Sequence, residues 1–131
     1  MKKYELTENY IIFNGRKLFQ IKAFISFGDV KPGDLGGYIE KERNLSQWDD
    51  NAWVSDNAVI YGNAMIYSNA VIYGNAVIYG NAKICGNAAI CGNTVICDNA
   101  IIKGNAKICG DINVGGYANI CGNAAIQTNK D

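Results

Sequence analysis

The sequence predicts an all-β protein in which a parallel β-solenoid follows a small β-hairpin. Three observations support this prediction. A six-residue pattern repeats from Leu45 to Thr128 without an insertion, Asn14-Gly15 separates two runs rich in β-forming residues, and charged residues are concentrated before the repeat. The chain has 131 residues, which is enough for one domain, or for one domain with a small cap.

The repeat has six places, numbered one to six as in Asn57-Ala58-Val59-Ile60-Tyr61-Gly62. Residues 45–128 number 84, which is 14 hexads of six residues. Place four is Ile in 11 hexads, place two is Ala in 11, place one is Asn in 11, and place six is Gly in nine. A period of six fits neither a helix nor a plain strand. It fits short strands that bend every six residues.

Each place has a physical reason. The β-branched Ile favours the centre of a strand, and the small Ala suits a crowded corner. The Gly-Asn pair supplies residues that tolerate left-handed backbone angles. Three bends close a triangular coil of about 18 residues, and the coils stack as a solenoid. We expect every place-four residue to lie inside, Trp48 included, and places three and five to point outward.

The segment before the repeat has a different character. Residues 1–50 contain eight basic and eight acidic residues, whereas residues 51–131 contain four of each. Asn14-Gly15 predicts a β-hairpin. The stretch GDVKPGDLGGY is expected to be loop, and its glycines Gly33, Gly36 and Gly37 do not match a phosphate-binding loop, because no helix follows. We therefore assign residues 1–44 to a hairpin and loop that cap the solenoid, 45–128 to the solenoid, and 129–131 to a tail.

The pattern Ile-x-Gly-Asn-Ala-x resembles the hexapeptide repeat of left-handed β-helix proteins, over about two thirds of the chain. The segment FGDVKPGDLGGYIEKERNLSQWDDNAWVSDNAVIYGNA also resembles the opening of bacterial and phage hexapeptide-repeat proteins that carry labels such as polymer-forming protein or putative transferase. The resemblance implies a single-stranded left-handed parallel β-helix, a triangular hexapeptide solenoid with an N-terminal β-hairpin cap.

Many left-handed β-helix proteins are coenzyme-A-dependent acyltransferases, and these enzymes usually use a His as general base. The chain contains no His, and its predicted hexads are not interrupted by acceptor-binding loops. Asp50, Asp56 and Asp98 occupy place six and Asp111 place one, where hydrogen bonding at the corners explains them. We therefore expect no catalytic residue, no enzymatic activity and no cofactor, and the transferase label does not carry over.

All five cysteines occupy place five, which earlier hexads fill with Tyr; they are Cys85, Cys91, Cys97, Cys109 and Cys121. Spacings of six put consecutive cysteines on different faces, so no metal site is expected. Only Cys91 and Cys109 should be direct neighbours, one coil apart, and this separation admits a disulfide. The odd count and a cytoplasmic location favour reduced thiols, with Cys as a small filler on a surface that something else buries.

One face of the predicted triangle carries no charge at its outward places. Its residues Val59, Tyr61, Val77, Tyr79, Val95 and Cys97 form a continuous apolar stripe. A monomer rarely exposes such a patch, so the stripe is predicted to be a subunit interface. The alternative is that the N-terminal hairpin folds back over this face within one chain.

Three functions are compatible with these observations. The first is a non-enzymatic structural or interaction protein that forms a homo-oligomer, with a trimer favoured. The second is a phage or bacterial binding protein that holds a nucleotide-like small molecule or a host factor in an inter-subunit cleft. The third is an acyltransferase that lacks the usual His. A formal net charge of +0 gives no reason to expect binding to nucleic acid or to a membrane, and the sequence start lacks the apolar segment of a signal peptide, so a cytoplasmic location is expected.

Overall fold

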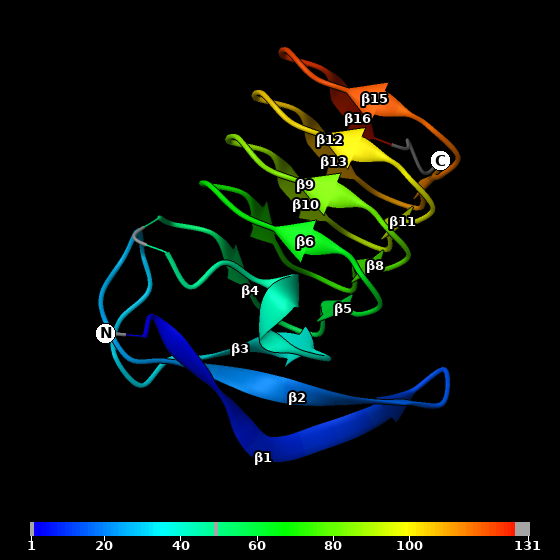
Figure 1. Ribbon diagram of the computed structural model, residues 1–131. Coiled ribbons are helices and arrows are strands. Elements are labelled where there is room, and N and C mark those ends of the chain that lie inside the picture. Colours follow the sequence, from blue (N-terminus) through cyan, green and yellow to red (C-terminus); the bar gives the residue numbers. More distant parts are fainter. Residues whose placement is uncertain (1, 49, 128–131) are drawn as a thin grey trace.

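The computed structural model describes residues 2–48 and 50–127 (Figure 1). Over these residues the protein is all-β, as predicted, with one short 3₁₀ turn and no α-helix. Its strands are β1 (Tyr4–Phe13), β2 (Arg16–Ala23), β3 (Leu35–Ile39), β4 (Trp53–Val54), β5 (Val59–Ile60), β6 (Met65–Ile66), β7 (Val71–Ile72), β8 (Val77–Ile78), β9 (Lys83–Ile84), β10 (Ala89–Cys91), β11 (Val95–Ile96), β12 (Ile101–Ile102), β13 (Lys107–Cys109), β14 (Asn113–Val114), β15 (Asn119–Ile120) and β16 (Ala125–Gln127), and the 3₁₀ turn η1 covers Glu42–Asn44. No helix in this part of the chain is long and apolar enough to span a membrane.

The predicted hairpin is confirmed. Strands β1 and β2 pair antiparallel, with Phe13 opposite Arg16 next to the turn. Asn14 and Gly15 have φ values of 51° and 77°, as a two-residue turn with positive φ at both positions requires. In Figure 1 the hairpin lies beneath the stacked coils, at the N-terminal end of the solenoid.

The stretch GDVKPGDLGGY is not all loop, and that prediction is wrong at its end. Strand β3 pairs antiparallel with β2 and parallel with β5, so it joins the hairpin to the solenoid. Two glycines permit this contact. A Cβ on Gly36 would lie 2.5 Å from the Val54 carbonyl oxygen, and one on Gly37 would lie 2.6 Å from that of Ala58. Both positions require glycine because no side-chain atom fits there.

The predicted coils are confirmed. Their strands stack along the solenoid into three sheets, as Figure 1 shows. The seven-stranded sheet has the order β1-β2-β3-β5-β8-β11-β14, the five-stranded sheet β16-β13-β10-β7-β4, and the four-stranded sheet β15-β12-β9-β6. Within the solenoid the pairs are parallel and join residues 18 positions apart, such as Ile60 with Ile78 and Ile78 with Ile96. The chain is thus a parallel β-solenoid with three strands in each coil.

The corners depend on place six. Glycines there have positive φ, for example 69° at Gly62, and the non-glycine residues Asp56, Ser68 and Asp98 have φ values of 58°, 60° and 58°. The Asn residues at place one keep negative φ and instead form ladders between coils. The Asn87 side-chain amide donates to Asn105 at 3.1 Å, and Asn105 donates to Asn123 at 3.2 Å.

The interior is built from places two and four. The Ile residues from Ile60 to Ile108 at place four are at most 1% exposed, as is each place-two Ala from Ala52 to Ala106. Thr94 replaces Ala at place two and is also fully buried, with its hydroxyl 2.8 Å from the Cys91 carbonyl oxygen. Stacking of identical β-branched side chains over successive coils supplies the apolar core.

The first predicted hexad does not follow the pattern of the repeat. Trp48 is 81% exposed, so the expectation that every place-four residue lies inside is wrong there. Leu45 instead bridges to Ile66 and is 1% exposed, and one hexad earlier Ile39 pairs with Ile60. Leu45 and Val54 are nine positions apart rather than six, so three extra residues lie between the first full coils and displace Trp48 outward.

The segment before the repeat also contributes to the core. Tyr4, Ile21 and Ile39 are fully buried in the same apolar cluster as the place-four residues. The Tyr4 hydroxyl donates to the Leu45 carbonyl oxygen at 2.6 Å, and burial raises the pKa of Tyr4 above its usual range. The hairpin therefore covers apolar residues that the first coil would otherwise expose to solvent.

Candidate functional site

The predicted stripe lies on the outer face of the seven-stranded sheet. Val59, Val77 and Val95 pair in register on β5, β8 and β11. Beside them, the rings of Tyr61 and Tyr79 stack with centroids 5.0 Å apart and planes 3° from parallel. The fold thus brings the outward places of this face side by side, because each coil repeats the last at a spacing of about 4.8 Å.

The hairpin covers the beginning of the stripe. Val59 is 3% and Tyr61 5% exposed, and both pack around the fully buried Leu18 of β2. The ring of Phe13 lies 5.9 Å from that of Tyr61, and the Asn14 side-chain amide donates to the Tyr61 hydroxyl at 3.0 Å. Val59 and Tyr61 are therefore already buried within one chain, as the alternative interpretation expects.

The remainder of the stripe lies beyond the hairpin. Val77, Tyr79, Val95 and Cys97 are half-buried. A hydrogen bond with the Cys97 thiol raises the pKa of the Tyr79 hydroxyl above its ordinary value. The ion pairs within the described residues all lie outside these four positions, between residues 2 and 50. The four side chains of this part carry no formal charge, and the hairpin bounds them on one side.

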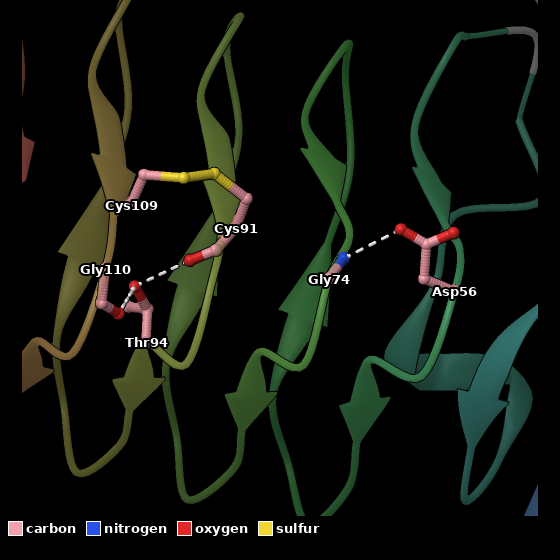
Figure 2. Close-up of a disulfide and its surroundings, with 6 residues drawn as sticks. All are labelled: Asp56, Gly74, Cys91, Thr94, Cys109 and Gly110. Atoms are coloured by element: carbon pink, nitrogen blue, oxygen red, sulfur yellow. Dashed lines mark hydrogen bonds between the residues drawn. A yellow bond between two sulfur atoms is a disulfide. The ribbon is translucent and has the colours of Figure 1, made fainter.

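The acidic residues of the repeat have structural positions. The Asp56 carboxylate accepts a hydrogen bond from the Gly74 amide at 3.0 Å, which Figure 2 shows at the corner between adjacent coils. Asp98 accepts from Gly116 at 2.8 Å, and Asp50 accepts from Ser68 at 3.1 Å. Each acid thus holds an amide one coil further along, which confirms the predicted corner hydrogen bonds.

Cys91 and Cys109 are joined by a disulfide across β10 and β13, with Cα atoms 4.6 Å apart (Figure 2). The predicted pairing of neighbours is confirmed, whereas the expectation of reduced thiols is wrong at this pair in this structure. In-register parallel stacking brings the two Cα atoms into the range that a disulfide spans. Cys85, Cys97 and Cys121 are free thiols.

Two further features were missed by sequence reasoning. Lys3 is 1% exposed, and its ammonium donates to Asp50 and to the Ala52 carbonyl oxygen, each at 2.8 Å. Burial lowers the pKa of Lys3, while Asp50 opposes the shift. The second feature is a cavity of about 550 Å³ lined by Trp48 and by residues of β6 and β9. The polar sequence around Trp48, QWDD, was a signal that this residue does not belong in the core.

No protein-family model matches the chain, and no curated protein matches it at a significant level.

Proposed function

We propose that this protein is a non-enzymatic structural or interaction protein, a rigid β-solenoid that self-associates through the uncovered part of the apolar stripe. The observation that carries the proposal is the surface formed by Val77, Tyr79, Val95 and Cys97. These residues are uncharged, in register and half-buried within one chain. Contiguous apolar surfaces of this kind are typical of protein contacts.

The covered part of the same stripe supports the proposal. The hairpin packs Phe13 against Tyr61, and Tyr61 also stacks on Tyr79. An aromatic side chain of a second subunit has the same type of contact available on Tyr79 and on the valines beside it. A homo-oligomer, with a trimer favoured by the resemblance to left-handed β-helix proteins, extends this packing between chains.

A non-enzymatic role agrees with the positions of the acids. Asp50, Asp56 and Asp98 each hold a backbone amide of the next coil, so their carboxylates have a structural purpose. The sequence contains no His to serve as a general base. These residues build corners rather than an acid–base pair.

Two double variants test the interface. Val77→Lys with Tyr79→Glu places charges on the stripe, and we expect a smaller species with an unchanged β-sheet signal. The matched control is Val71→Lys with Tyr73→Glu, which changes the same Val-Ile-Tyr pattern one hexad earlier, on the five-stranded sheet. Light scattering with circular dichroism measures both. A wild-type monomer, or an equal loss of assembly in the control, would contradict the proposal.

A further inference from the structure

We propose that the cavity lined by Trp48 binds a small organic anion that carries a flat aromatic ring. The site is distinct from the apolar stripe, because it lies on the four-stranded sheet, where η1 and the following segment lie next to β6 on its N-terminal side (Figure 1). The cavity volume of about 550 Å³ is in the range of small-molecule sites. The lining residues are Glu42, Arg43, Leu45, Ser46, Gln47, Trp48, Met65, Ile66, Tyr67 and Lys83.

The three extra residues between the first coils create the site. Leu45 fills the core position under Ile66, and the chain then leaves the regular coil. Trp48 is held on the resulting turn by two hydrogen bonds: its amide donates to the Ser46 hydroxyl at 3.1 Å, and its carbonyl oxygen accepts from the Asp50 amide at 2.8 Å. The Asp50 carboxylate also accepts from the buried Lys3. Trp48 is thus bonded to Ser46 and Asp50 through its backbone, while the residue is 81% exposed.

The walls of the cavity favour a flat apolar group. Trp48 lines the cavity together with Met65 and Tyr67, which lie on and beside β6. The floor contains Leu45 and Ile66, which belong to the buried core. Tryptophan and tyrosine bind aromatic rings by stacking and edge contacts. An exposed indole in the same lining as Leu45, Met65, Ile66 and Tyr67 offers apolar surface to a planar ligand.

The charges select the sign of the ligand. Arg43 and Lys83 line the cavity, are exposed, and take part in none of the ion pairs found among residues 2–48 and 50–127. Among the described lining residues, Glu42 is the one acid; it is paired with Lys2 at 3.0 Å and accepts a hydrogen bond from Gln47 at 3.0 Å. Two free cations beside a neutralised acid favour a carboxylate, sulfonate or phosphate on the ligand.

Two fluorescent probes test the site. Anilinonaphthalene sulfonate is an aromatic anion, and N-phenylnaphthylamine has the same ring system without charge. We expect saturable binding of the sulfonate to the full chain and quenching of Trp48 emission, with Trp48→Ala removing the binding of both probes. Arg43→Gln and Lys83→Gln should each weaken sulfonate binding about two- to fivefold, as exposed ion pairs do, and leave the neutral probe unaffected.

The matched control is Lys103→Gln, because Lys103 is exposed, follows β12 on the same face and lies outside the cavity lining. It should leave the binding of both probes unchanged. Equal weakening by Lys103→Gln, or unchanged binding in Trp48→Ala, would overturn the proposal. A third outcome would also overturn it: light scattering finds an oligomer whose fraction rises with protein concentration, which does not bind the probe and which Trp48→Ala abolishes. A second copy of the chain would then occupy the cavity. Loss of assembly in the stripe variant with intact probe binding would show that the two surfaces act independently.

Discussion

The two regions of this molecule are stabilised in different ways. In the repeat, the same few contacts recur in each coil: place-four Ile on place-four Ile, and place-one Asn on place-one Asn, 18 positions apart. In the segment before it, each contact occurs once. The described ion pairs all lie between residues 2 and 50, and the buried Lys3 has no counterpart in the coils. A periodic region therefore follows one rule, whereas the first region depends on individual side chains.

The largest effect is expected at the centre of the repeat. Ile84 is fully buried on β9. Ile84→Asp places an unpaired charge in the apolar core, and its cost exceeds the stability of about 5–15 kcal/mol that a domain has in total. Ile84→Val, the matched control, should cost only about 0.5–1.5 kcal/mol. Circular dichroism and urea unfolding measure both, and a soluble, fully folded Ile84→Asp protein would contradict this register.

The next effect concerns the disulfide that joins two adjacent coils. Replacing Cys91 and Cys109 by Ser should lower the free energy of unfolding by about 3 kcal/mol, because the disulfide closes a loop of 18 residues in the unfolded chain. Cys85→Ser and Cys97→Ser are controls at free thiols. Thiol titration of the protein from freshly lysed cells should find three of the five cysteines reactive after denaturation. Five reactive thiols would show that the pair is reduced in the cell, as the predicted cytoplasmic location requires.

A moderate effect is expected from the buried ion pair of the first region. Lys3→Ala removes the ammonium that donates to the Asp50 carboxylate and to the Ala52 carbonyl oxygen, which should cost about 1–3 kcal/mol. Lys2→Ala removes the exposed pair with Glu42 and should change stability by less than about 1 kcal/mol. Urea unfolding compares the two neighbouring lysines. Equal costs would mean that the buried pair does not stabilise this region.

The smallest effect appears only at high pH. The pKa of Tyr4 in the folded state is above its ordinary value of 10.0. The folded protein therefore retains a proton that the unfolded chain releases, and stability falls as the pH rises above 10, by up to about 1.4 kcal/mol per pH unit. Tyr4→Phe should reduce this slope. Urea unfolding at about pH 9 and about pH 11 measures how far the stability of each protein falls with pH. An equal fall in the wild type and in Tyr4→Phe would show that other groups cause the loss of stability.

Much of the repeat could be predicted from the sequence. A period of six, with the size and branching of the side chains, accounts for four features. These are the 18-residue coil, the inward Ile and Ala, the stacking of Cys91 on Cys109 and the corner positions of the acids. Gly-rich place six indicated where the backbone needs positive φ, and Asp56, Ser68 and Asp98 adopt it as well. Local patterning determined these features because each coil meets the same neighbours.

The tertiary structure alone decided the rest. By its count in the hexad frame, Trp48 should lie in the core, yet Leu45 fills that position. The reason is that β3 already stacks on β5, one coil before the predicted repeat. Three extra residues then have to leave the coil. Gly36 and Gly37 form a strand because the hairpin and first coil leave no space for a Cβ. The burial of Tyr61 and Lys3 depends on chain segments more than 40 residues away. Such contacts occur once in the molecule, so no period in the sequence records them.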